Sequence, residues 1–178
     1  MRSPMMATAL ALWSFCVGAL PVLAQELRPN RVTINYGEPS DARHRPLLKA
    51  LQERQALETM QRILSPIKLP RALDLRTRSC DGEVNAWYED DAITICYEYI
   101  EWISEVAHKA KRALPVSDEG ALIGPFVELV VHEAAHAIFD YLKTPIMGRE
   151  EDAADQMAAL WILTFGKSRA ADLAGGRC

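Results

Sequence analysis

The chain has 178 residues, four cysteines and a formal net charge of −4 at pH 7. This length suits a single domain with one hydrophobic core. Because the chain is mildly acidic and carries no basic stripe, we do not expect it to bind nucleic acid.

The N-terminal residues 1–24 predict a secretory signal peptide. A positively charged start is followed by an apolar stretch at 5–23, and small or aliphatic residues precede a cleavage point after Ala24. A membrane anchor is the alternative, but Pro21 interrupts the stretch, and no later segment has the uninterrupted apolar length needed to span a bilayer. Cleavage leaves one domain of 154 residues, 25–178, and its net charge becomes −5 because one arginine is lost. We therefore expect an exported protein, periplasmic or secreted, with no stable membrane insertion after cleavage.

Hydrophobic spacing predicts strands mainly in the first part of the mature chain and helices in the last part. Alternating apolar residues indicate strands, helical spacing indicates helices, and Pro or Gly marks the turns between them. The expected elements are a strand at 31–36, a turn at 37–41, a helix at 46–64, strands at 72–77, 85–88 and 92–96 (the last two joined by a hairpin turn at 89–91), a helix at 97–114, a loop at 115–120, a helix at 127–139, a loop at 143–148, a helix at 149–163 and a loose tail at 168–178. This order predicts an α+β domain with a small, mostly antiparallel sheet and helices packed on one face.

The expected helix at 127–139 contains His132-Glu133-Ala134-Ala135-His136, which matches the pattern H-E-x-x-H. In this pattern two imidazoles one helical turn apart bind zinc, and the glutamate acts as a general base. The helix is apolar on nearly every face and is expected to be buried, so its polar trio needs a compensating partner such as a divalent metal. The alternative is a chance match, with two histidines that only form hydrogen bonds on a structural helix.

The expected last helix begins with a run of acidic residues in which Glu151 and Asp155 are four apart and share one face. Catalytic zinc usually has three protein ligands and keeps a fourth position for water, so Glu151 is the expected third ligand. Asp155 is expected to accept a hydrogen bond from the far nitrogen of a ligand histidine. The alternative is an ordinary acidic helix start, which the helix dipole favours.

These motifs resemble those of the gluzincin metallopeptidases, in which a glutamate on a second helix completes the metal site. Glu151-x-x-Ala154-Asp155 is similar to the second motif of the CAAX-type and heat-shock-type gluzincins, which is E-x-x-A-D. Asn85-Ala86-Trp87-Tyr88 resembles the N-A-aromatic edge strand beside their active-site cleft. The resemblance implies a minimal zincin-like fold in which Asn85, Ala86 and Trp87 bind extended peptides by strand pairing.

The mature chain is also similar to a family of short, exported bacterial proteins whose description is "putative metallopeptidase". That family combines H-E-x-x-H with a Cys…Asn-Ala-x-Tyr…Ile-x-x-Cys-Tyr-Glu segment and a Gly-Arg-Glu-Glu-Asp stretch. Both are present here, at 80–98 and 148–152. The resemblance implies no particular substrate.

Three cysteines, Cys80, Cys96 and Cys178, remain after the expected cleavage. Export makes a disulfide chemically reasonable. Because Cys80 and Cys96 flank the expected hairpin, we expect a disulfide between them, which leaves Cys178 unpaired. Metal binding by the cysteines is the alternative, but the chain has no C-x-x-C spacing.

We therefore predict a zinc metalloendopeptidase. Zn²⁺ would be held by His132, His136 and Glu151, and a metal-activated water would hydrolyse peptide bonds of a peptide or protein substrate with Glu133 as general base. One alternative is a zinc-stabilised, non-catalytic peptide-binding protein of the cell envelope, and another is a structural protein with an accidental motif. Glu133 favours the enzyme because a binding protein needs no general base. The sequence specifies no oligomeric state. It offers four residues that could stabilise an oxyanion by their chemistry alone: Tyr88, Tyr97, His108 and Tyr141.

Overall fold

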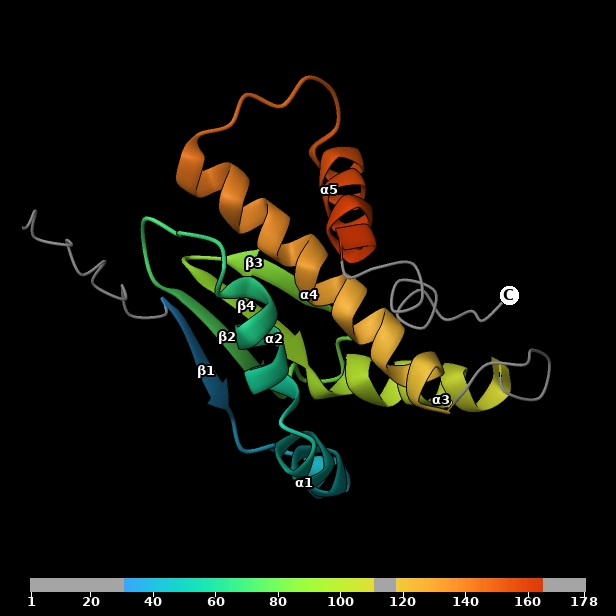
Figure 1. Ribbon diagram of the computed structural model, residues 1–178. Helices are drawn as coiled ribbons and strands as arrows, with labels where there is room; N and C mark the ends of the chain where they lie inside the picture. Colours follow the sequence, from blue (N-terminus) through green and yellow to red (C-terminus); the bar gives the residue numbers. More distant parts are fainter. Residues whose placement is uncertain (1–30, 111–117, 165–178) are drawn as a thin grey trace, which may run out of the picture.

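A computed structural model describes residues 31–110 and 118–164 (Figure 1). The elements are, in chain order, β1 (Val32–Tyr36), the 3-10 helix η1 (Ala42–His44), α1 (Arg45–Glu53), α2 (Ala56–Leu64), β2 (Leu73–Arg78), β3 (Ala86–Glu89), β4 (Ala92–Cys96), α3 (Tyr97–Ala110), α4 (Asp118–Leu142) and α5 (Glu150–Thr164). The expected signal peptide and the C-terminal tail with Cys178 lie outside the described residues.

The four strands of the described residues form one sheet in the order β1-β2-β4-β3. β1 pairs with β2 and β2 with β4 in parallel, and only β3 and β4 are antiparallel. The α+β class is confirmed, but the expectation of a mostly antiparallel sheet is wrong.

The cause lies in the connections and in the position of β4. β1 and β2 are joined by a crossover through α1 and α2, which brings consecutive strands side by side in the same direction. All five residues of β4 are buried, whereas β3 is partly exposed. The apolar β4 therefore takes the central position beside β2, and β3 runs back along its outer side as the edge strand.

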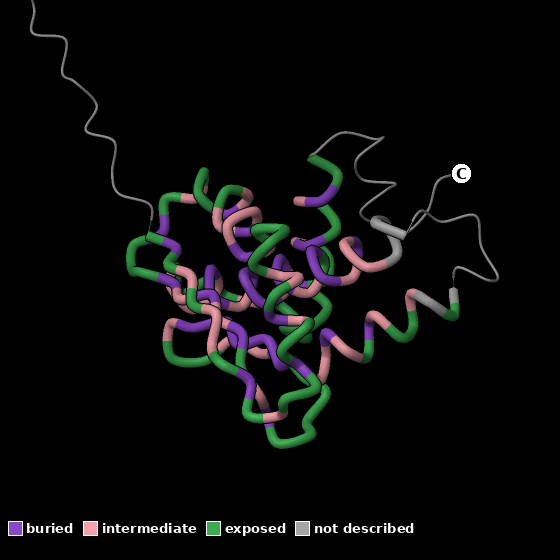
Figure 2. Tube along the Cα trace, turned by 90° about the horizontal axis from the view of Figure 1, so that it is seen from below, coloured by how far each residue is buried: buried purple, intermediate pink, exposed green. Residues whose placement is uncertain are grey.

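One face of the sheet supports the core. In β2, residues Leu73, Leu75 and Thr77 are buried while the residues between them are more exposed. This alternation puts the apolar side chains on the face that the helices cover, and the other face carries polar pairs such as Arg76 with Thr94 (2.9 Å). Figure 2 shows the buried stretches gathered in the middle of the chain trace and the exposed ones in the outer turns.

The helix expected at 46–64 is broken into α1 and α2. Gln55 adopts a left-handed backbone conformation (φ 51°) between them. The hydroxyl of Tyr36 lies at this break, where it accepts the N–H of Leu57 (2.9 Å) and donates to Glu58 (2.7 Å). Hydrogen bonding to β1 thus replaces the continuous helix, which periodicity could not indicate because the apolar spacing continues across the break.

α4 is the longest helix, and it begins at Asp118, within the segment expected to be a loop. It continues through Pro125 and packs against α3, α5 and β3 (Figure 1). Contrary to expectation, its Leu122–Leu142 stretch is long and apolar enough to cross a membrane, with mean hydropathy 1.4. Because this apolar character is also that of a core helix, and α4 is covered by its neighbours, the stretch is weak evidence of a membrane span.

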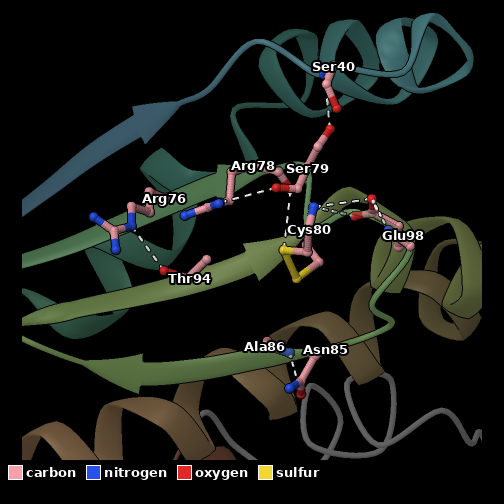
Figure 3. Close-up of a disulfide and its surroundings, with 11 residues drawn as sticks. Ser40, Arg76, Arg78, Ser79, Cys80, Asn85, Ala86, Thr94 and Glu98 are labelled. Carbon is pink, nitrogen blue, oxygen red and sulfur yellow. Dashed lines mark hydrogen bonds between the residues drawn. A yellow bond between two sulfur atoms is a disulfide. The ribbon is translucent and has the colours of Figure 1, made fainter.

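The expected disulfide between Cys80 and Cys96 is present, with 5.5 Å between their Cα atoms. It joins the ends of the parallel neighbours β2 and β4 rather than the two strands of the β3–β4 hairpin (Figure 3). The hairpin lies between the two cysteines in the chain. Glu98 accepts the backbone N–H groups of Cys80 and Gly82 (3.1 and 3.3 Å). Burial alone would raise the pKa of Glu98, but hydrogen bonds from backbone N–H groups lower it below its ordinary value. With both sulfurs bonded to each other, Cys80, Cys96 and Glu98 are not a metal site.

A polar cluster attaches the end of α4 to the sheet. Asp140 accepts hydrogen bonds from Tyr88 on β3 (2.8 Å), from Arg71 before β2 (2.6 Å) and from Lys143 (2.7 Å). The Arg71 guanidinium also lies 4.3 Å from the ring centre of Tyr141. The hydrogen bonds from Lys143 and Tyr88 lower the pKa of Asp140 to about 2.

Replacing both Cys80 and Cys96 by alanine is expected to lower the free energy of unfolding by about 3 kcal/mol, because the bond closes a loop of 16 residues. Urea denaturation with and without reductant measures the loss. Reduction of the double variant is the control and should change nothing. An equal stability of the oxidised wild type and the double variant would contradict the expectation.

Asp140→Asn is expected to lower the melting temperature at pH 7. Because the folded-state pKa of Asp140 lies below its ordinary value of 3.8, its contribution to stability is complete above about pH 4 and is lost as the pH falls toward about 2. The difference in melting temperature between wild type and variant should therefore shrink over this interval, as measured by circular dichroism. A difference that stays constant from pH 7 to pH 2 would show that the charge of Asp140 is not the cause.

Candidate metal centre

One face of α4 faces a cavity of about 640 Å³. Pro125, Glu128, Leu129, His132 and His136 lie on this face, at the spacing of successive helical turns. β3 lines a second side of the cavity, and the first turns of α5 line a third side. We call this cavity the cleft.

Three possible ligand atoms converge in the cleft. His132 Nε2 lies 3.2 Å from His136 Nε2 and 3.1 Å from Glu151 Oε2, and His136 Nε2 lies 3.6 Å from the same oxygen. The imidazoles are largely buried, with 18% and 14% of their side chains exposed, whereas Glu151 is exposed. The structure thus brings together the three residues that the sequence predicted as metal ligands, in a group whose size fits one ion.

The opposite nitrogen of each imidazole is bound by another carboxylate. His132 Nδ1 lies 2.8 Å from Asp155, and His136 Nδ1 lies 2.8 Å from Glu150. Because an ionised carboxylate only accepts hydrogen bonds, each Nδ1 carries a proton that it donates. In the neutral imidazole, each Nε2 therefore presents a lone pair to the centre of the group.

This arrangement fits a bound cation. Two nitrogen lone pairs and an anionic oxygen within 3.1 to 3.6 Å of one another repel unless a positive charge lies between them. Two imidazole nitrogens and one carboxylate oxygen are also a ligand set found at catalytic zinc sites. The residues present are therefore suited to a divalent metal with nitrogen and oxygen ligands.

Glu133 is buried beside this group and is held by the sheet. Its Oε2 accepts the backbone N–H of Tyr88 on β3 at 2.8 Å, across 45 positions of the chain. Burial raises the pKa of Glu133 above its ordinary value, although the neighbouring imidazoles and the Tyr88 N–H offset part of this increase. The carboxylate is thus positioned by a tertiary contact between α4 and β3.

The predicted substrate-binding residues, Asn85, Ala86 and Trp87, all line the cleft. The carbonyl of Asn85 accepts the N–H of Cys96 on β4, and its side chain accepts the N–H of Ala86 (Figure 3). By the alternation of an antiparallel pair, the backbone groups of Ala86 and Tyr88 face away from β4, toward the open edge. This side of β3 is the one on which Glu133 lies.

The structure does not favour the tyrosines considered as oxyanion-stabilising residues. Tyr97 is fully buried with its hydroxyl bonded to Thr77 and Gly37, and Tyr141 donates to the carbonyl of Ala72. Tyr88 lies at the cleft, but its hydroxyl proton is donated to Asp140. The side chain of His108 lies outside the described residues.

Several cleft residues were missed from the sequence. Glu150, at the first position of α5, is the hydrogen-bond partner of His136. The number of ligand imidazoles could have indicated it, because two imidazoles need two carboxylate acceptors and Asp155 supplies one. Glu128 and Leu129 lie one turn before His132 on the same helix face, so helical spacing could also have identified them. Tyr99 comes from α3, and no local pattern indicates its place in the cleft.

Glu151→Gln is expected to weaken metal retention most, because it removes a donor atom from the centre of the group. Glu150→Gln and Asp155→Asn should each weaken it by about 10- to 100-fold, because they remove the acceptors that orient the imidazoles. Competition with a chelator measures the dissociation constants. Asp152→Asn is the matched control, since this exposed carboxylate of the same turn pairs, within the described residues, only with Arg149, at 3.9 Å. A loss in Glu150→Gln no greater than in the control would show that its hydrogen bond to His136 does not support the site.

Comparison with known proteins identifies the family. A family described as "Putative metallopeptidase" matches residues 36–175. No curated protein and no solved structure matches the chain. The family implies a metal ion and a peptide substrate, and the group of His132, His136 and Glu151 could bind such an ion. Because the match covers well over half of the 178 residues, the chain belongs to this metallopeptidase family.

Proposed function

We propose that this protein is a zinc-dependent endopeptidase in which Glu133 is the general base. The observation that carries the proposal is the convergence of two imidazole Nε2 atoms and the Glu151 carboxylate, with both Nδ1 atoms in hydrogen-bond contact with carboxylates on α5. A buried carboxylate next to this group, at the wall of an open cleft, favours hydrolysis over a purely structural metal site.

His132, His136 and Glu151 would hold the zinc ion. Three protein ligands leave a coordination position open, as catalytic zinc sites require. Zinc bound there would polarise a carbonyl group and make a water molecule easier to deprotonate. Asp155 and Glu150 would keep both imidazoles in the tautomer that binds metal.

Glu133 would move the proton. Its Oε2 is engaged by the Tyr88 N–H, so Oε1 is the atom left to take a proton from water and to return it to the leaving nitrogen. The same hydrogen bond fixes the carboxylate relative to β3, where the substrate would lie. General base catalysis requires this fixed geometry more than it requires any particular pKa.

β3 would bind the substrate backbone as an added strand. The open edge of β3 offers the carbonyl groups of Ala86 and Tyr88, which an extended peptide can reach with its own N–H groups. Trp87, between them, is part of the cleft lining. The edge strand and Glu133 would therefore act on the same peptide. β3 would bind its backbone, and Glu133 would act at the bond to be cleaved.

We also propose that the protein acts outside the cytosol. The Cys80–Cys96 disulfide supports this, because such bonds persist mainly in oxidising compartments. The N-terminal sequence expected to be a signal peptide agrees with it.

The decisive experiment compares wild type with Glu133→Gln, each loaded with zinc. Glutamine keeps the size of the side chain and an oxygen to accept the Tyr88 N–H, so the fold and metal content should be unchanged, with one zinc per chain in both proteins. Hydrolysis of a quenched-fluorescent peptide library should fall by about 10²- to 10⁴-fold in the variant. Glu105→Gln is the control for the loss of one negative charge, because Glu105 is an exposed carboxylate on α3.

Equal hydrolysis by wild type and Glu133→Gln would remove the mechanism. A zinc-loaded wild type that binds library peptides and cuts none would favour the non-catalytic peptide-binding protein. Absence of stoichiometric metal from both proteins would instead make the His-Glu-His motif accidental.

A further inference from the structure

Resting on the proposed function, we propose that the cleft selects substrates with a long, aliphatic and positively charged side chain, lysine or arginine, and that Glu128 binds its charge. The relevant part of the cleft lies one to two helical turns before His132. We call this part of the lining the side pocket, and we define it by Tyr99, Pro125, Glu128 and Leu129, which are all among the residues that line the cleft.

α4 supplies three of the four residues from one face. Pro125, Glu128 and Leu129 precede His132 by seven, four and three positions, which is the spacing of neighbours along a helix surface. Because His132 belongs to the candidate metal centre, a substrate bound at that centre has its adjacent side chains within reach of this stripe. The side pocket is therefore placed to distinguish substrates by a residue close to the scissile bond.

The walls of the side pocket are largely apolar or aromatic. Leu129 and Pro125 are partly buried on α4, and Tyr99 contributes an aromatic ring from α3. The ring of Trp102 lies 5.8 Å from that of Tyr99 and is half exposed, so aromatic surface continues beyond Tyr99. Such walls bind the methylene groups of lysine or arginine, and aromatic rings also attract their charged ends.

Glu128 provides the charge at the rim. It is exposed, and among the described residues it has no hydrogen bond or ion pair, unlike Glu133, Glu150, Glu151 and Asp155, which are bonded to imidazoles or backbone. Burial, together with the negative charges of Glu128 and Glu133, raises the pKa of Tyr99 above its ordinary value. No lysine or arginine of the described chain lines the cleft. An apolar pocket with an unneutralised carboxylate at its rim matches a side chain with an aliphatic stem and a cationic end.

The test measures binding rather than turnover. Zinc-loaded Glu133→Gln is titrated into fluorescein-labelled alanine–glycine octapeptides that carry one central lysine, norleucine or glutamate, and fluorescence anisotropy gives the dissociation constants. Norleucine keeps the aliphatic stem and lacks the charge. We expect the lysine peptide to bind about fivefold more tightly than the norleucine peptide, and this difference to shrink as salt is added.

Variants of Glu128 in the same background assign the preference. Glu128→Gln should make lysine and norleucine equal, and Glu128→Lys should make glutamate the preferred residue. Glu105→Gln removes an exposed charge elsewhere on the helices and should leave the lysine preference intact. Wild-type kcat/KM for the same peptides should follow the binding order.

Equal binding of lysine and norleucine peptides, or a lysine preference that survives Glu128→Gln, would overturn the inference, as would failure of the lysine peptide to bind. These outcomes are separate from those of the proposed function, because a protein that cleaves peptides without regard to charge would retain the Glu133 mechanism. Conversely, a lysine preference in binding that depends on Glu128 would stand even if hydrolysis did not depend on Glu133.

Discussion

Packing of α5 on α4 is the interaction on which the candidate site depends. The two imidazoles come from α4, but the carboxylate of the candidate ligand set and both carboxylates that fix the imidazole tautomers come from α5. Ala154 and Ala158 are buried on α5, and small side chains at a contact allow two helices to approach closely. A shift of α5 by one turn would separate all three carboxylates from the imidazoles at once.

The sheet supplies the second constraint, through β3. Tyr88 contacts α4 twice, with its backbone N–H on Glu133 and its hydroxyl on Asp140 two turns later. The edge strand is thereby held in one register relative to the helix that carries the histidines. The same strand that would bind substrate also positions the proposed base, so the cleft is a property of the α4–β3 contact rather than of either element alone.

The disulfide also restricts the position of the β3–β4 hairpin. It joins the ends of β2 and β4, and Glu98 fixes the turn that follows Cys80. Only a few residues separate that turn from Asn85 at the start of the cleft wall. A covalent closure at this point limits the conformations available to the edge strand.

The amino-acid sequence by itself determined the local features: the H-E-x-x-H helix, the spacing of Glu151 and Asp155, the α+β order and the choice of Cys80 and Cys96 as a pair. These follow from periodicity and spacing within one element, or from residues that flank one short segment. The parallel direction of most strands, the break at Gln55, the attachment of Glu133 to Tyr88 and the place of Tyr99 in the cleft were decided only by the tertiary structure. Each arises from contacts between segments far apart in the chain, and a local pattern carries no information about which distant group will satisfy it.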